Sequence, residues 1–120
     1  MGNIIKIVGL IFSLVSFSSC GNGNYKDILI TGIVKDAKSK LPLSNASVKI
    51  KCWAYSTQKW ESKFTTKEVN SDFHGKFKVR FSEGEALDIS AILDEYNIFE
   101  KSITLNKSNI ELDVELNKSK

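Results

Sequence analysis

Side chains able to do acid, base or metal chemistry are sparse in this sequence. Among its 120 residues, His74 is the only histidine and Arg80 the only arginine, and the two cysteines, Cys20 and Cys52, lie far apart. A zinc site needs three or four close ligands, and a nucleophile needs a base beside it. The chain also lacks a Cys-x-x-Cys pair, a nucleophile elbow and a Gly-rich phosphate loop. We therefore predict no catalytic residue, no metal site and no cofactor, in a protein that is not an enzyme.

His74 lies in the stretch SDFHGKF, residues 71–77, between two runs that alternate apolar and charged residues. Asp72 is suited to accept backbone hydrogen bonds from residues just after it, and Gly75 to adopt a positive φ. These are the requirements of a hairpin tip. Metal binding by His74 would need partner ligands, and none stands at ligand spacing. We predict that His74 is a solvated turn residue.

Large aromatic residues are the other candidates for a site. Cys52 alternates in phase with the apolar residues around it, so we expect it to be a small buried hydrophobe. Trp53 and Tyr55 then point to the solvent side of the same strand, and Trp60 follows the next turn. Exposed aromatics of this kind contact carbohydrates and proteins. The alternative is that the second sheet or the 56–64 loop covers them, and the sequence leaves both interpretations open.

The first 19 residues have the pattern of a secretory signal peptide. Lys6 and the amino terminus supply positive charge, residues 7–17 are uncharged and mostly apolar, and Ser18 and Ser19 follow. A membrane-spanning helix is the alternative, but the uncharged run is shorter than the roughly 20 residues that a bilayer requires. Residues 21–24, which follow, are polar and rich in glycine. We predict a signal peptide over residues 1–19.

The end of this segment resembles a known processing motif. The letters FSSC, residues 17–20, resemble the lipobox of bacterial lipoproteins, with Phe17 where leucine is favoured and Ser19 where glycine or alanine is favoured. The resemblance implies that Cys20 becomes the first mature residue and carries a thioether diacylglycerol and an amide-linked fatty acid such as palmitate. Three acyl chains would hold the protein durably on a membrane. The alternative is ordinary cleavage near Ser19, which would leave Cys20 as a free thiol.

Downstream of residue 27 the apolar residues recur with a period of two, as in half-buried strands. The pattern predicts strands over residues 28–36, 47–55, 59–69, 77–81, 87–91, 99–105 and 110–116. We predict an all-β fold, an Ig-like or transthyretin-like antiparallel β-sandwich of about seven strands. The expected boundaries are a lipidated tether over residues 20–27, one domain over 28–117 and a tail over 118–120.

The same region resembles the carboxypeptidase regulatory-like domain of the transthyretin-like group. The family pattern runs G-x-V-x-D, P-L-x-x-A-x-V and T-D-x-x-G-x-F, then a Gly-Tyr turn and a final alternating strand. The matching residues are Gly32, Val34, Asp36, Pro42, Leu43, Ala46, Val48, Asp72, Gly75 and Phe77. Ser71 replaces the threonine and Glu95 replaces the glycine of the Gly-Tyr turn. The resemblance implies a mostly non-catalytic β-sandwich.

Charge excludes few partners. The formal net charge of the whole chain is +3. A basic stripe (Lys76, Lys78, Arg80) and an acidic stripe (Glu111, Asp113, Glu115) would pair if their strands were neighbours. The basic stripe is short and the chain carries an export signal, so we predict no nucleic-acid partner.

Together these features predict a lipid-anchored, non-enzymatic module for binding or assembly in the bacterial cell envelope, with the membrane and an envelope protein or glycan as partners. No acidic run follows Cys20, which favours the periplasmic face of the outer membrane, and the cell surface stays open. One alternative is a glycan-binding module that uses Trp53, Tyr55 and Trp60. A more distant alternative is a hydroxyisourate hydrolase of the transthyretin-like group, which uses several histidines and a C-terminal Tyr-Arg-Gly-Ser that this chain lacks.

Overall fold

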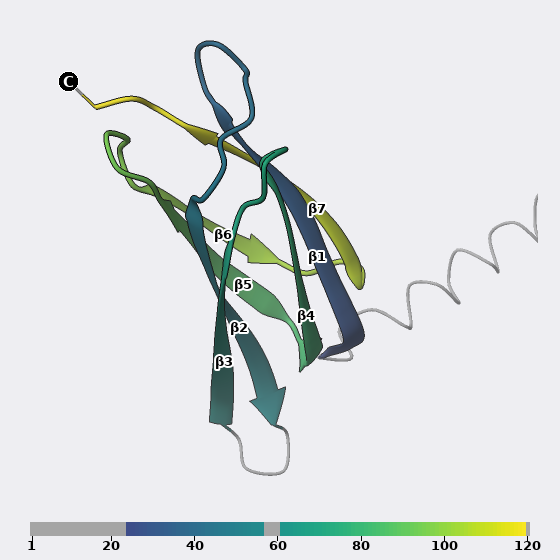
Figure 1. Cartoon of the computed structure of the whole chain (residues 1–120). Coiled ribbons are helices and arrows are strands. Elements are labelled where there is room, and N and C mark those ends of the chain that lie inside the picture. The colour runs from purple at the N-terminus through teal and green to yellow at the C-terminus, as the bar shows by residue number, and fades with distance from the viewer. Residues whose placement is uncertain (1–23, 57–60, 120) are drawn as a thin grey trace, which may run out of the picture.

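The computed structural model describes residues 24–56 and 61–119, which form two β-sheets facing each other (Figure 1). The predicted signal peptide, Cys20 and Trp60 lie outside the described residues. The strands are β1 (Tyr25–Asp36), β2 (Ser47–Ser56), β3 (Glu61–Asn70), β4 (Lys76–Gly84), β5 (Ala86–Ile92), β6 (Phe99–Thr104) and β7 (Asn109–Leu116). The predicted all-β sandwich of about seven strands is confirmed.

The strand order shows how the chain builds the two layers. Sheet A has the order β4-β1-β7 and sheet B the order β3-β2-β5-β6. Every pairing of these strands is antiparallel except that of β1 with β7, which is parallel. The connection after β6 leaves sheet B and brings β7 alongside β1 in sheet A. The basic stripe on β4 and the acidic stripe on β7 are therefore separated by β1, and the condition for their pairing within the chain is not met.

The apolar residues of the alternating pattern line the interior of the sandwich. Along β4, Phe77, Val79 and Phe81 are buried, whereas the basic residues between them are exposed. Because successive side chains of a strand point to opposite faces, one row of each strand fills the space between the sheets. Side chains from both sheets with no exposed area meet there: Ile28, Ile30, Val34, Val48, Ile50 and Leu87.

Strand β3 is one of the two edge strands of sheet B. Lys67 stands opposite Ile50 on the inward row of β3, its ammonium lies 5.2 Å from the centre of the Phe81 ring, and its Nζ donates to the carbonyl of Arg80 at 2.5 Å. An inward-pointing lysine on an edge strand discourages pairing with further strands. Lys67 thus links β3 of sheet B to β4 of sheet A.

Both ends of the sandwich extend beyond the predicted domain boundaries. Strand β1 begins at Tyr25, inside the segment predicted as tether, because Tyr25 and Lys26 pair with Gly84 and Glu83 of β4. At the other end, the amide of Ser119, in the predicted tail, donates to the carbonyl of Glu95 at 2.9 Å. None of the residues that the structure describes belongs to a helix long and apolar enough to cross a bilayer.

Candidate functional site

The outer face of sheet B brings several large side chains together. Trp53 of β2 stands directly opposite Phe64 of β3. Their ring centroids are 5.0 Å apart and the ring planes are tilted by 55°. Phe64 is 54% exposed, so this pair is an apolar patch open to solvent rather than part of the core. Aromatic patches on sheet faces are a common feature of binding surfaces.

Charged and polar groups border this aromatic pair. The ammonium of Lys51 lies 4.5 Å from the centre of the Phe64 ring and 5.5 Å from that of Trp53, within cation–π range. The indole Nε1 of Trp53 donates to Asp88 Oδ2 at 2.8 Å, and the Ser102 hydroxyl donates to Asp88 Oδ1 at 2.8 Å. The hydrogen bond from Trp53, followed by that from Ser102, holds the pKa of Asp88 below its ordinary value. The carboxylate therefore fixes the orientation of the indole ring.

The structure places two of the three predicted aromatic residues. Trp53 and Tyr55 lie in β2 and are half-buried, and Trp60 lies outside the described residues. The Tyr55 amide donates to Asn24 Oδ1 at 3.0 Å, and Asn24 Nδ2 donates to the Tyr55 carbonyl at 2.9 Å. This pair of bonds ties the first described residue of the chain to the end of β2.

Sequence reasoning missed Phe64 as a site residue. The inward row of β3 holds Lys63, Thr65 and Lys67 and becomes apolar only at Val69, so most of the strand lacks the apolar row that marked the other strands. The only available signal was an aromatic residue on the opposite row of that strand. Its position against Trp53 depends on the β2–β3 register, which the sequence pattern does not specify.

The stretch around His74 forms the predicted turn between β3 and β4. Asp72 Oδ1 accepts the amides of Lys76 and His74, each at 2.8 Å, and these bonds hold the pKa of Asp72 below its ordinary value. Gly75 has φ = 75°, in the region that favours glycine. The side chain of His74 is exposed. The turn geometry predicted from Asp72 and Gly75 is confirmed.

Asp36 closes a second turn at the same end of the sandwich. Its Oδ1 accepts the amides of Ser39 at 2.9 Å and Lys38 at 2.8 Å, and its Oδ2 accepts the hydroxyl of Tyr96 at 2.8 Å. The bonds from Ser39, Tyr96 and Lys38, in that order, lower the pKa of Asp36 from 3.8 to about 2. Tyr96 follows Glu95, whose φ of 74° lies in the region that favours glycine.

The low pKa of Asp36 predicts acid sensitivity. Folding stabilises the ionised form of Asp36. Its contribution to the free energy of unfolding is therefore fully present above the unfolded pKa of 3.8 and is lost as the pH falls through the folded pKa of about 2. We expect Asp36→Asn to flatten this part of the profile of unfolding free energy against pH, as measured by urea unfolding followed by circular dichroism. Asp94→Asn, at an exposed position in the β5–β6 connection, is the control and should leave the slope unchanged. Equal slopes for the wild type and Asp36→Asn would contradict the assignment.

Cys52 lies in the core, 2% exposed, as its alternation predicted. Burial raises the pKa of its thiol above the ordinary value, which keeps it protonated and unreactive. In the described part of the chain, no three His, Cys, Asp or Glu side chains are grouped so that they could hold a metal ion.

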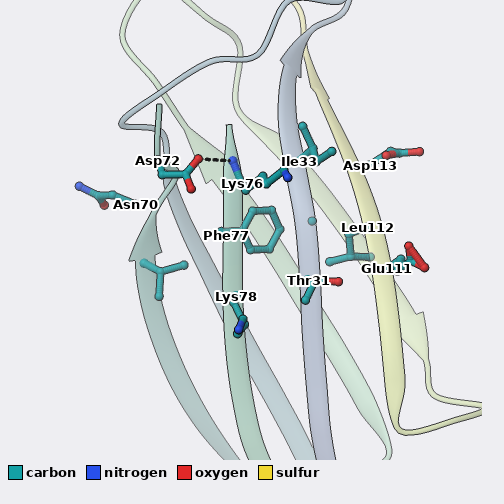
Figure 2. A pocket seen from close by; sticks show the side chains of 12 residues that line it. Thr31, Ile33, Asn70, Asp72, Lys76, Phe77, Lys78, Glu111, Leu112 and Asp113 are labelled. Carbon is teal, nitrogen blue, oxygen red and sulfur yellow. Dashed lines mark hydrogen bonds between the residues drawn. The ribbon is translucent and has the colours of Figure 1, made fainter. Parts of the chain in front are cut away.

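A hollow of about 620 Å³ lies at sheet A (Figure 2). The residues that Figure 2 labels around it come from three neighbouring strands, together with Asn70 and Asp72 near the β3–β4 turn. Basic side chains of β4 stand on one side and acidic side chains of β7 on the other. The charged and central residues are Thr31, Ile33, Lys76, Lys78, Glu111 and Asp113. This lining contains hydrogen-bonding and ionic groups.

The described chain is a seven-stranded β-sandwich of the Ig-like class. No protein-family model and no curated protein sequence matches it.

Solved structures with this fold include proteins of different kinds. The pilus 2b backbone protein of group B streptococcus is 16% identical, with a TM-score of 0.58 over 77% of this chain and 41% of that one. The C-terminal domain of the shaft pilin SpaA from Lactobacillus rhamnosus GG is 17% identical, with a TM-score of 0.53 over 79% of this chain and 100% of that one. The 3-chlorocatechol 1,2-dioxygenase of Rhodococcus opacus 1CP is 10% identical, with a TM-score of 0.65 over 82% and 62%. At these identities the likeness shows the fold alone, and this chain spans less than two thirds of the pilus protein and of the dioxygenase.

Proposed function

We propose that this protein is a lipid-anchored, non-enzymatic module for binding or assembly in the bacterial cell envelope, and that the outer face of sheet B is its contact surface. The observation that carries the proposal is the pair of half-buried Trp53 and exposed Phe64, with Lys51 above it and Asp88 at its border. Aromatic side chains surrounded by polar groups are the usual energetic centres of protein interfaces.

Three carboxylates serve as hydrogen-bond acceptors that hold turns or a side chain in place, and this structural use supports a non-enzymatic role. Asp36 and Asp72 accept backbone amides in turns, and Asp88 holds the indole of Trp53. All three have a pKa below the ordinary value, whereas a general acid or base at neutral pH needs a pKa near 7.

The positions that resemble the carboxypeptidase regulatory-like domain have structural roles consistent with that family. Gly75 adopts the positive φ of the turn, Asp72 holds that turn together, and Gly32 lies directly opposite Phe77 in the core. Glu95 adopts a positive φ where the family has glycine. We propose that the domain is a divergent member of this group.

The anchor would enter the sandwich at one end. Strand β1 starts at the end opposite the 37–46 connection and the β3–β4 turn, which lie together at the far end (Figure 1). A lipid on Cys20, four residues before Asn24, would therefore place those turns away from the bilayer. The outer face of sheet B would then form one side of the molecule and be accessible to partners on the membrane.

The proposal predicts where the protein is found in the cell. We expect Cys20→Ala to move the protein from the membrane fraction to the soluble fraction and to abolish incorporation of labelled palmitate, because the thioether needs the thiol. Lys38→Ala, at an exposed turn position, is the matched control and should remain in the membrane and carry the label. Retention of Cys20→Ala in the membrane fraction would refute the anchor.

Glycan binding is a second candidate, favoured by the stacked aromatic surface with Asp88 and Ser102 as hydrogen-bonding groups beside it. Sugars stack on aromatic rings while their hydroxyls bond to such groups. In a Trp60→Phe background, which leaves Trp53 as the only indole, oligosaccharides should change the fluorescence, and Phe64→Ala should weaken the response about tenfold or more, a loss of about 1.4 kcal/mol. Thr104→Ala, on β6, serves as the control. An unchanged spectrum across envelope glycans would remove this candidate.

A further inference from the structure

The outer face of sheet A is divided into three parallel stripes. Strand β4 supplies the exposed basic residues and β7 supplies the acidic ones. Strand β1 lies between them with half-buried Leu29, Thr31 and Ile33, and with Lys35 beside Glu115 beyond them. The register sets two levels across the face, one with Lys76, Ile33 and Asp113 and one with Lys78, Thr31 and Glu111. Figure 2 shows these six side chains on their three strands.

The charges of the two stripes are not neutralised by each other. Strands two positions apart are separated by about 9.6 Å. Among the described residues, the ion pairs are Lys26 with Glu83 and Lys40 with Glu115. The two central levels, which contain Lys76, Lys78, Glu111 and Asp113, hold no ion pair of their own. Across these two levels the face is therefore positive on one side, uncharged in the middle and negative on the other side.

We propose that this face binds a second copy of the chain, face to face, about a two-fold axis parallel to β1. Such a rotation exchanges the two sides of the face and keeps each level in place. Lys76 then faces Asp113 of the other copy, Lys78 faces its Glu111, and Ile33 meets its own counterpart on the axis. The same patch is used by both copies, as in other two-fold interfaces.

Charge complementarity favours this axis over a two-fold axis perpendicular to the strands. A two-fold axis perpendicular to the strands would place β4 against β4 and β7 against β7, and would oppose like charges along both stripes. Facing sheets pack about 10 Å apart, a distance that lysine and carboxylate side chains can bridge from both sides. A second copy supplies both charges in the required order and at the required spacing, which is why we choose it as the occupant.

The interface is small, which sets the expected affinity. Three strands about 4.8 Å apart and seven residues rising about 3.3 Å each cover roughly 14 by 23 Å. That is well below the roughly 800 Å² per partner of stable complexes. We therefore expect a weak dimer whose association depends on charge and falls as salt screens the pairs.

Charge-swap variants test the inference in the full chain. Two copies with different C-terminal tags are produced together, extracted in one non-ionic detergent and purified through one tag at low salt, about 25 mM, and at high salt, about 500 mM. Glu111→Lys/Asp113→Lys makes the charged residues of the two central levels all basic, and Lys76→Glu/Lys78→Glu makes them all acidic. Each variant should fail to pair with itself, with recovery of the second tag at least fivefold below wild type. Mixing the two variants should restore it, because every facing pair is again of opposite charge.

The control is Lys38→Glu/Lys101→Glu, in the 37–46 connection and on the edge strand β6, which should pair like the wild type at low salt. Circular dichroism confirms that each variant is folded, and the substituted side chains are all exposed. Self-pairing of the single-sign variants, no pairing of the wild type at low salt, or no recovery on mixing would overturn the inference, and another occupant would then have to be sought. The outcome is independent of Cys20 and of the surface of sheet B.

Discussion

Gly32→Val is expected to lower the free energy of unfolding by about 1–3 kcal/mol, enough to unfold a marginal domain. A Cβ at position 32 would stand 2.6 Å from Cε2 of Phe77 and 2.8 Å from the carbonyl oxygen of Leu112. That carbonyl belongs to the backbone of β7, so it cannot move aside without disturbing the β1–β7 pairing. Urea unfolding followed by circular dichroism measures the loss.

Two further variants show whether crowding is the cause. Gly32→Ala/Phe77→Leu removes the ring that a methyl group would meet, and it should recover part of the stability that Gly32→Ala alone loses. Thr31→Val, at the neighbouring position on the outer row of β1, should change the unfolding free energy by less than about 0.5 kcal/mol. A Gly32→Val protein as stable as the wild type would mean that β1 does not pack against Phe77 in this way.

Ile50→Ala is expected to cost about 2–5 kcal/mol of unfolding free energy. Ile50 has no exposed surface and lies in β2, between Lys67 of β3 and Ile89 of β5. Removing its outer carbons leaves a cavity between two sheets that are held apart by their other side chains. The urea midpoint should fall, while the dependence of free energy on denaturant should stay the same.

The matched control for Ile50→Ala is Lys49→Ala. Lys49 is the preceding residue of β2, is exposed, and points to the outer face of sheet B. Its substitution should change stability by less than about 0.5 kcal/mol. If the two variants lost similar stability, or if Lys49→Ala lost more, the assignment of the inner and outer rows of β2 would be reversed.

The strands were predictable because burial imposes a local pattern. Val48, Ile50 and Cys52 alternate with exposed or half-buried residues, and each predicted strand lies within a few residues of an observed one. The turn at Asp72 and Gly75 was predictable for the same local reason, since the side-chain acceptor and the positive φ are properties of single residues.

The order of the strands in the sheets and their register were not predictable, because they depend on contacts between residues far apart in sequence. The parallel β1–β7 pairing separates the basic and acidic stripes that could have been neighbours. The position of Phe64 against Trp53 depends on a register that a strand with lysines on its inner row does not reveal. Of the candidate surface, Trp53 was therefore predicted, whereas Lys51, Phe64 and Asp88 emerged only from the fold.

The central claim is that this protein acts by recognition through the outer face of sheet B. Its most direct test is affinity isolation of the full chain from membranes, followed by mass spectrometry, with the wild type compared to Trp53→Ala/Phe64→Ala. We predict that the wild type retains a specific envelope component, that the double variant loses it while staying folded and in the membrane, and that Lys38→Ala retains it. Recovery of the same component by the double variant would contradict the claim.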